Sequence, residues 1–308
     1  MSTVMILEND YRSHLNTIPR WHFSMLNDFE RNVKFKEAIS SVDLTNKLVL
    51  DIGTGSGFLS MLAVQQGAKH VYTCESNYYV AEKAKQIIDR NGFSNSITVI
   101  NKLSTDLIVG IDLPDMMDVL ISETVDCGFF GEGFGISLIH AKKNLLKDSA
   151  LIIPESVKMY CALLSSSRIN NLNSVPLDVL GLDLTLFNDF KTPGYFPVRL
   201  NTWEHSLVTE SKEFLNLKFS DELTFSSEYN IKFTAHENAS VHGVVFWFEL
   251  GLTEGVYLTN SPSNHHSHWM QAFQNFQKTI EVINGNSYSI SCSTNQNGID
   301  FYYKYESD

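Results

Sequence analysis

Between residues 47 and 150, short apolar runs alternate with stretches of helical periodicity, and this alternation constrains the fold more than any other feature. Strands are expected at Lys47–Ile52, His70–Glu75, Ser96–Ile100 and Met117–Ser122, and helices at Gly57–Gln66, Val80–Arg90 and around Ile136–Leu146. Strands that follow one another through helices form a parallel, doubly wound sheet. This part of the chain is therefore predicted to be α/β and Rossmann-like.

The pattern changes after Pro154, where the chain becomes rich in Ser, Asn and aromatic residues. Runs such as Val157–Ser165, Ser240–Leu252 and Gly298–Tyr305 are typical of antiparallel strands separated by Asn-Gly turns. Strand periodicity is weak at about 168–205, so an inserted arm is expected there. The 308 residues are thus predicted to form two domains, 1–155 with N-terminal helices and the parallel sheet, and 156–308, mainly antiparallel and β-barrel-like.

Composition narrows the classes of partner. The formal net charge is −12, which disfavours direct nucleic-acid binding because attraction to phosphate needs a basic face. The same charge either attracts cationic partners or serves solubility alone. The sequence shows neither an apolar run of about 20 residues, as a membrane helix needs, nor a secretory signal. With four scattered cysteines and no CxxC pair, we expect a cytoplasmic protein without a membrane or zinc role.

A glycine-rich loop follows the first predicted strand, in the stretch VLDIGTGSG at residues 49–57. Glycines there permit positive φ and let the backbone approach a ligand closely. Such loops lie at the carboxyl ends of parallel strands, where α/β sheets bind their ligands. The spacing is GxGxG, which differs from the GxGxxG of dinucleotide sites. Glu75 closes the second strand, where a carboxylate is suited to two ribose hydroxyls.

Two carboxylates, Glu123 and Glu132, flank a short loop rich in Gly and Phe after the fourth strand. A guanidinium has five donors that carboxylates bind through paired, charge-assisted hydrogen bonds. It stays protonated, so its reaction requires a nitrogen held in line with the reacting group while charge is drawn away. The pair is suited to that task, and the alternative is two surface acids on a loop. Asp126, between them, is either a third acid or a turn cap.

These motifs resemble those of the protein arginine methyltransferase family, within the class I methyltransferases that bind S-adenosylmethionine. Residues 49–75 are similar to its motif I and post-I segments, and residues 122–132 (SETVDCGFFGE) to its double-E loop. The resemblance implies S-adenosylmethionine as cofactor and Glu123 and Glu132 as catalytic residues. It implies further cofactor-binding residues at Asp51, Gly53, Gly55, Glu75, Ser104 and Thr105, the last two at the adenine.

Two flanking segments extend the resemblance. WHFSMLNDFERN, at residues 21–32, is similar to the family's MLxDxxR segment, and NHHSHWMQ, at 264–271, to its Thr-His-Trp loop with Ser267 in place of Thr. The resemblance implies that Arg31, with His22, binds the cofactor and that Met25 lines the pocket. It also implies that His268 pairs with Asp28 in catalysis and that Trp269 walls the arginine channel. The adjacent histidines cannot easily converge on one ion, so no metal is expected.

The implied activity is N-methylation of an arginine guanidinium, with protein arginine preferred as the substrate. Phe134 stands two residues beyond Glu132, where many members have Met, and its larger ring favours monomethylation. The double-E and His-Trp-Met segments are closest to branches that make monomethyl or symmetric dimethyl products, and the arm corresponds to a dimerisation arm, which implies a homodimer. Free arginine or another small guanidine is an alternative substrate, and an inactive cofactor-binding scaffold is a second alternative.

Overall fold

The computed structural model describes residues 18–304, so the first 17 residues of the predicted N-terminal helical part lie outside it. The chain forms two units. Of the described residues, unit 1 holds 18–124, Ile136–Glu155 and Gly251–Leu258, and unit 2 holds Val125–Gly135, Ser156–Leu250 and 259–304. The chain passes from unit 1 to unit 2 mainly between Glu155 and Ser156. Two short segments are exceptions: Val125–Gly135 belongs to unit 2, and Gly251–Leu258 belongs to unit 1.

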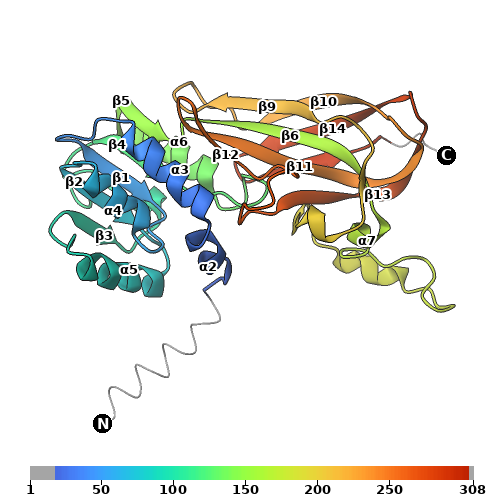
Figure 1. Cartoon of the computed structure of the whole chain (residues 1–308), viewed down its shortest axis with the longest axis horizontal. Coiled ribbons are helices and arrows are strands. Elements are labelled where there is room, and N and C mark those ends of the chain that lie inside the picture. The colour runs from blue at the N-terminus through green and yellow to red at the C-terminus, as the bar shows by residue number, and fades with distance from the viewer. Residues whose placement is uncertain (1–17, 305–308) are drawn as a thin grey trace, which may run out of the picture. The chain divides into compact units, whose positions relative to one another are not determined.

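Unit 1 contains the predicted parallel sheet (Figure 1). Its five strands lie in the order β3-β2-β1-β4-β5, and all four neighbouring pairs are parallel. The strands are β1 (Leu48–Ile52), β2 (His70–Cys74), β3 (Ile97–Ile100), β4 (Met117–Ser122) and β5 (Leu146–Ile153). From β1 the chain adds β2 and then β3 on one side of β1, and it then adds β4 and β5 on the opposite side of β1. The carboxyl ends of β1 and β4 therefore form the switch point, where sheets of this kind bind ligands.

The helices of unit 1 follow the sequence pattern. They are α2 (Trp21–Leu26), α3 (Phe29–Ser40), α4 (Phe58–Gln65), α5 (Tyr78–Arg90) and α6 (Phe134–Asn144), whose first two residues belong to unit 2. In α5 the buried residues Ala81, Ala84 and Ile88 recur at helical spacing, and the Asn77 side chain caps the first turn. None of the helices in residues 18–304 is long and apolar enough to cross a membrane.

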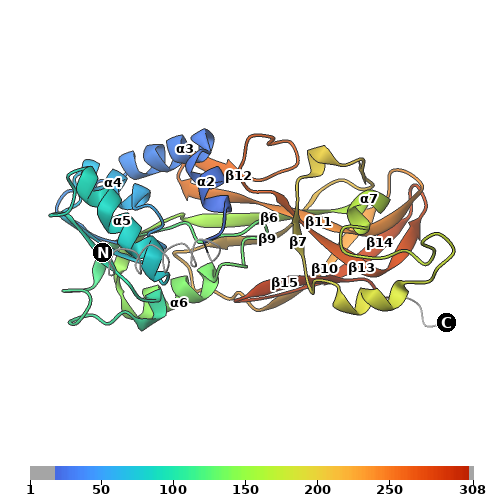
Figure 2. The ribbon, with the colours of Figure 1, turned by 90° about the horizontal axis from the view of Figure 1, so that it is seen from below.

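Unit 2 is mainly antiparallel, as the sequence predicts, and Figure 2 shows β6, β11 and β13 running side by side. One sheet follows the order β7-β13-β11-β6-β8, with β9 added on β6 and β12 on β11, and a second has the order β10-β14-β15. The strands are β6 (Ser156–Ser165), β7 (Phe196–Val198), β8 (Ser206–Leu207), β9 (Lys212–Lys218), β10 (Ser227–Thr234), β11 (Ala239–Thr253), β12 (Val256–Thr259), β13 (Gln271–Val282), β14 (Ser287–Asn295) and β15 (Gly298–Tyr302). The last residues of β11 and most of β12 belong to unit 1, in the segment Gly251–Leu258.

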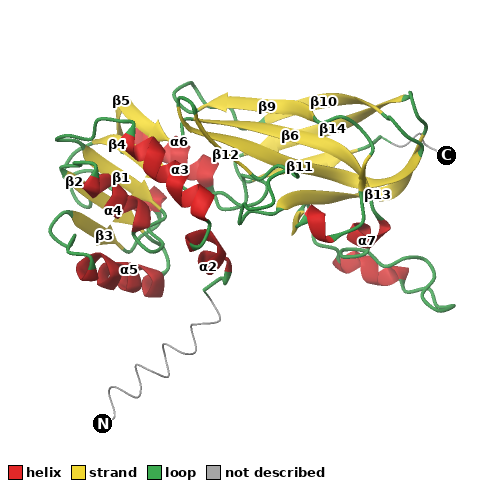
Figure 3. Ribbon diagram, viewed as in Figure 1, coloured by secondary structure: helices red, strands yellow, loops and turns green. Residues whose placement is uncertain are grey.

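The predicted arm leaves and rejoins the sheet of unit 2 between β6 and β8. It begins with α7 (Ser167–Asn170), continues through the 3-10 turn Thr185–Phe190, and returns through β7 and the 3-10 turn Leu200–Thr202. Figure 3 shows it as helical turns and loop lying outside the yellow strands. Residues 171–184 contain no helix or strand.

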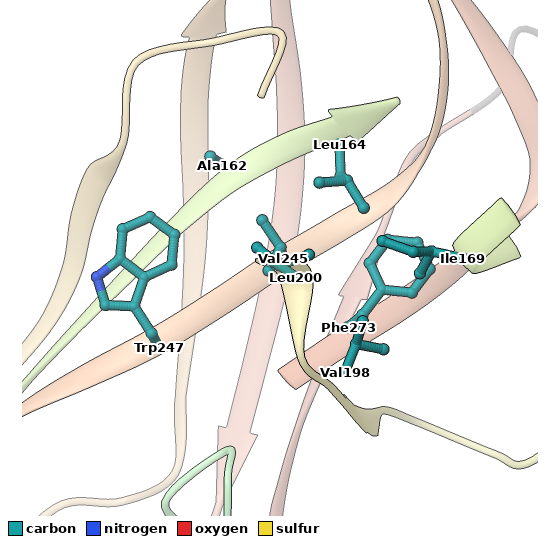
Figure 4. Close-up of a cluster of buried hydrophobic side chains, with 8 residues drawn as sticks. All are labelled: Ala162, Leu164, Ile169, Val198, Leu200, Val245, Trp247 and Phe273. Carbon is teal, nitrogen blue, oxygen red and sulfur yellow. The ribbon is translucent and has the colours of Figure 1, made fainter. Parts of the chain in front are cut away.

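Both ends of the arm are anchored in a buried apolar cluster of unit 2 (Figure 4). Ile169 enters this cluster from the start of the arm, and Val198 and Leu200 enter it from the end. They pack against the sheet residues Ala162, Leu164, Val245, Trp247 and Phe273. Burial of an aliphatic side chain of this size contributes about 1.5–3 kcal/mol, so the base of the arm is fixed to the sheet.

Candidate active site

The glycine loop of unit 1 adopts the backbone that only glycine tolerates well. Gly53, Gly55 and Gly57 have φ of +88°, +51° and +79°. A Cβ on Gly53 would also lie 2.6 Å from Cγ2 of Thr124, the residue after Glu123. Gly53 therefore allows the loop after β1 to pass close to the end of β4.

Asp51 is buried at the end of β1 beneath this loop. Its Oδ2 accepts hydrogen bonds from Ser60 Oγ at 2.5 Å and Thr73 Oγ1 at 3.1 Å. Its Oδ1 is buried and accepts no hydrogen bond from the described residues. Burial raises the pKa of Asp51 to about 7, although the two hydroxyl donors lower it. The free oxygen is therefore available to a donor or cation of a ligand.

Glu75, half-buried at the end of β2, faces the glycine loop. Its Oε2 accepts the N–H of Gly55 at 3.3 Å and its Oε1 accepts the N–H of Asn77 at 2.9 Å. The other predicted cofactor residues, Ser104 and Thr105, lie in a short 3-10 turn after β3. Ser104 is buried and donates to Ser137 Oγ on α6 at 3.0 Å. These residues follow the carboxyl ends of neighbouring strands, so parallel pairing gathers them at one edge of the sheet.

The predicted MLxDxxR segment forms α2 and the start of α3. Met25 is the buried residue of α2, and half-buried His22 stacks on Trp21 with ring centroids 4.0 Å apart. Asp28 is buried at the N-cap of α3 and accepts the N–H of Arg31 at 2.9 Å. Asp28 therefore fixes the first turn of the helix that carries Arg31.

Arg31 and Glu123 form a buried ion pair. Arg31 Nη2 lies 2.5 Å from Glu123 Oε2, and the two side chains are 3% and 5% exposed. Arg31 Nη1 donates to Asn32 Oδ1 at 2.9 Å, and the guanidinium lies 5.1 Å from the centroid of the Phe35 ring. Its Nε is buried and donates to no described residue. Glu123 thus already binds one guanidinium, and Arg31 keeps a free donor.

The loop after Glu123 belongs to unit 2 from Val125 onward. Glu132 is exposed and lies between two glycines, Gly131 and Gly133. Asp126 accepts the N–H of Gly128 at 3.1 Å and that of Gly131 at 2.9 Å. Of the two roles that the sequence left open for Asp126, the structure shows the turn cap.

Aromatic rings pack behind this loop. Phe129 has a φ of +75°, a strained conformation for a large residue that costs of order 1–3 kcal/mol. Its fully buried ring lies 5.1 Å from that of Phe130 and 5.3 Å from that of Phe134. Phe134, predicted to restrict the substrate space, is 1% exposed and also packs 5.1 Å from Phe219. The cluster therefore holds both the strained residue and the Phe134 ring in place.

The predicted Thr-His-Trp-like loop lies between β12 and β13. Trp269 is buried, and its Nε1 donates to the carbonyl of Val125 at 2.9 Å. The half-buried His268 ring lies 4.0 Å from the Trp269 ring. Trp269 was predicted to wall a channel, and the structure adds that it holds the start of the double-E loop. The pairing of His268 with Asp28 joins residues of different units and stays a prediction.

Sequence reasoning missed three residues that hold the loops of unit 2. The Tyr195 hydroxyl donates to Asp126 Oδ2 at 2.9 Å, and Asn260 Nδ2 donates to the carbonyl of Cys127 at 2.9 Å. Arg199 donates to the carbonyls of Ser267 and His268 at 3.2–3.3 Å. Each is an isolated polar residue in a β-rich region, so no spacing marks it. Within residues 18–304, no group of three His, Cys, Asp or Glu side chains is placed to hold a metal ion.

Two family models match parts of the chain. Residues 159–306 match the model of the arginine methyltransferase oligomerization subdomain. Residues 36–126 match that of the ribosomal protein L11 methyltransferase PrmA.

Curated relatives extend over most of the chain. The arginine N(omega)-methyltransferase of Streptomyces achromogenes subsp. streptozoticus is 40% identical over 273 residues, which cover 89% of this chain and 75% of that protein. Protein arginine N-methyltransferase 9 of Mus musculus is 30% identical over 298 residues, covering 86% of this chain and 35% of that protein. The chain therefore spans three quarters of the first relative and about a third of the second.

Solved structures share the fold. The Trypanosoma brucei PRMT1 enzyme–prozyme heterotetrameric complex with AdoHcy contains a chain that matches with a TM-score of 0.79 at 21% identity, covering 93% of both chains. Arabidopsis thaliana protein arginine methyltransferase 10 matches with a TM-score of 0.70 at 20% identity, covering 88% of this chain and 86% of that one.

Proposed function

The chain belongs to the protein arginine methyltransferase family and is an arginine N-methyltransferase, and from this premise we propose how its residues carry out the reaction. The observation that carries the proposal is the buried contact between Glu123 and the Arg31 guanidinium. This contact supports the proposal, because the Glu123 carboxylate, at the switch point of the sheet, accepts a hydrogen bond from the guanidinium of Arg31. A substrate guanidinium has four N–H donors besides that of its alkylated nitrogen, so it can bind Glu123 and Glu132 through different edges.

The residues of unit 1 fit S-adenosylmethionine, which supplies an electrophilic methyl group when it is bound. Arg31 keeps a buried donor, Nε, suited to the carboxylate of the amino-acid part, and Asp51 keeps a buried acceptor, Oδ1. Glu75 lies beside the loop at a strand end, where its carboxylate suits ribose hydroxyls. Ser104 and Thr105 are the proposed adenine contacts.

The chain's own part in the reaction is to bind, orient and polarise the acceptor. We assign Glu123 and Glu132 the task of fixing the guanidinium plane and drawing its positive charge away from the nitrogen that attacks. One carboxylate, or His268 with Asp28, accepts the proton that this nitrogen loses. The assignment of His268 is supported by the similarity of its loop to the Thr-His-Trp loop of the family.

We propose arginine within proteins or peptides as the substrate. The −12 net charge favours cationic polypeptides, and relatives such as the mouse protein named above are protein arginine methyltransferases. Free arginine is the second candidate. The Streptomyces relative favours this candidate, because its name specifies arginine without specifying a protein. Its identity to this chain is higher than that of the mouse protein, and the match covers a larger share of its length.

Monomethylation is the proposed product level. The proposal rests on position 134, where many members of the family have Met and this chain has the larger ring of Phe134. That ring is buried against Phe129 and Phe219, behind the loop that carries Glu132. The expected result is monomethylarginine alone from the wild type, and dimethylarginine in addition from Phe134→Met. Mass spectrometry of hydrolysed products measures this. Efficient dimethylation by the wild type would contradict it.

An assay with labelled S-adenosylmethionine tests the activity and separates the substrates. The protein is incubated with Gly-Arg-rich peptide and, separately, with free arginine. Glu123→Gln should lower transfer by at least about a hundredfold, because a neutral amide no longer balances the guanidinium charge, while binding of S-adenosylmethionine is largely kept. Glu82→Gln, which alters an exposed Glu paired with Lys85 on α5, is the matched control. Label in free arginine alone would overturn the peptide substrate, and equal turnover by Glu123→Gln and the wild type would remove Glu123 from the mechanism.

We also propose that the protein is a homodimer joined through the arm. Large apolar side chains of the arm are exposed, among them Leu177, Leu180, Leu186, Phe187 and Phe190 at 65–99%. Exposed apolar groups gathered on one projecting segment mark an interaction site. The oligomerization subdomain model covers this segment.

A further inference from the structure

The loop between the two glutamates is held by a side chain that approaches from the end of the arm. The Tyr195 hydroxyl donates to Asp126 Oδ2 at 2.9 Å, across 69 positions of sequence. Tyr195 directly precedes β7, in which Phe196 pairs with Phe273 of β13. Its ring also lies 5.1 Å from that of Phe246 on β11. The sheet of unit 2 therefore fixes the position of Tyr195 and of its hydroxyl.

The loop passes close to both partners of this hydrogen bond. A Cβ on Gly128 would lie 2.5 Å from the Tyr195 ring, and a Cβ on Gly131 would collide with the Asp126 carboxylate. Asp126 uses its other oxygen, Oδ1, to accept the N–H groups of the same two glycines. Tyr195 thus restrains Asp126, and Asp126 restrains Gly131, the residue before Glu132.

A second anchor holds the neighbouring residue. Asn260 is fully buried, and its Nδ2 donates to the carbonyl of Cys127 at 2.9 Å and to that of Met270 at 2.8 Å. Its Oδ1 accepts the N–H of Phe248 on β11 at 2.8 Å. With Asn260 fixing Cys127 independently, loss of the Tyr195 hydroxyl should release the Asp126 side chain and the Gly131 turn without unfolding the loop.

We propose that Tyr195 is a positioning residue of the methyl transfer, acting through Asp126 to set the place of Glu132 against the guanidinium. The proposal rests on the function assigned above to Glu132. Because a displacement of about 1 Å at a catalytic group lowers rates by up to about a hundredfold, Tyr195→Phe should lower kcat about ten- to a hundredfold. Binding of S-adenosylmethionine should be unchanged, because its proposed contacts lie in unit 1.

The variants isolate the hydroxyl. Tyr195→Phe keeps the ring contact with Phe246. Tyr302→Phe is the matched control, since it removes a Tyr–carboxylate hydrogen bond of 2.7 Å to Glu228 in the same unit. Asp126→Asn keeps an oxygen for the Gly128 and Gly131 N–H groups and should retain most of kcat, whereas Asp126→Ala should lose it. Adding Tyr195→Phe to Asp126→Ala should cause little further loss, because the two residues act in series.

Two readouts decide the proposal. Steady-state kinetics should show a lower kcat for Tyr195→Phe, with Tyr302→Phe like the wild type. Hydrogen–deuterium exchange should show faster exchange at Gly128 and Gly131 in Tyr195→Phe. Wild-type kcat and exchange in Tyr195→Phe would overturn the positioning role, as would an equal fall of kcat in Tyr302→Phe. Absence of any methyl transfer by the wild type would instead refute the proposed function, while the exchange measurement would still test the hold of Tyr195 on the loop.

Discussion

At the scale of single residues, Asp51 is a carboxyl group held where water does not reach it. Burial raises its pKa to about 7 from an ordinary value of 3.8, so the folded state binds a proton more tightly than the unfolded chain does. Between about pH 4 and pH 7 the folded state therefore carries more protons at this site, and the Asp51 contribution to stability declines as the pH rises.

This gives a pH-dependent prediction. The melting temperature of the wild type should fall relative to that of Asp51→Asn as the pH is raised from 5 to 8, because the amide has no charge to bury. Differential scanning calorimetry of both proteins at several pH values measures the difference. Asp148→Asn, at an exposed position on β5, serves as the control. A difference that stays constant or grows in the opposite direction would contradict the prediction.

Residues differ in how far sequence reveals them. Arg31 and Glu123 were both predicted as site residues from their motifs, but their direct pairing was not, because 92 positions separate them and only the packing of α3 brings them together. Tyr195 and Asn260 could not be predicted. A single tyrosine or asparagine carries no spacing signal, and its role exists only once β7 and β11 are in place.

At the scale of elements, the strand–loop–helix unit at Gly53 combines two demands that can be separated. Gly53 needs positive φ and also lacks space for a Cβ, whereas Gly110 has the same φ of +88° and open space, with no atom within 4 Å of where a Cβ would lie. Gly110→Ala therefore measures the conformational cost alone, about 1–2 kcal/mol.

Gly53→Ala should destabilise the protein by more than Gly110→Ala does, and it should also weaken binding of S-adenosylmethionine at least about tenfold. The second effect is expected because the new methyl group displaces Thr124 and with it the end of β4. Urea denaturation and isothermal titration calorimetry provide the two measurements. If the two variants lose equal stability and both bind like the wild type, the crowding at Gly53 has no functional role.

The elements of unit 1 were predicted well because each buried strand is followed by a helix of clear periodicity. Met117–Ser122 appears with its predicted bounds, and the others differ by one or two residues at their ends. β5 was missed. It is an edge strand, paired only with β4, and Lys147 to Ser149 are exposed, so its first half lacks the apolar run that marks an inner strand.

At the scale of the whole molecule, the arm provides the proposed contact between copies. Leu180→Glu combined with Leu186→Glu should convert a dimer into a monomer, because two side chains each contributing about 1.5–3 kcal/mol on burial would be replaced by charges. Size-exclusion chromatography with light scattering measures the mass. Ile283→Glu, which changes an exposed apolar residue between β13 and β14, should leave the mass unchanged. A monomeric wild type, or a double variant that stays dimeric, would refute the role of the arm.

The interleaving of the two units has a consequence for recombination. A single crossover at residue 155 would separate Gly251–Leu258 from the unit it folds with, where the Gly251 carbonyl accepts the N–H of Glu155 at 2.8 Å and Thr253 meets Ser41 at 3.2 Å. The same crossover would also keep Val125–Gly135 from this chain while replacing the residues that bind it, Tyr195 at Asp126 and Asn260 at Cys127, by those of the relative. A chimera that exchanges unit 2 with that of a relative must therefore exchange three segments at once, namely Val125–Gly135, Ser156–Leu250 and the segment that begins at Thr259.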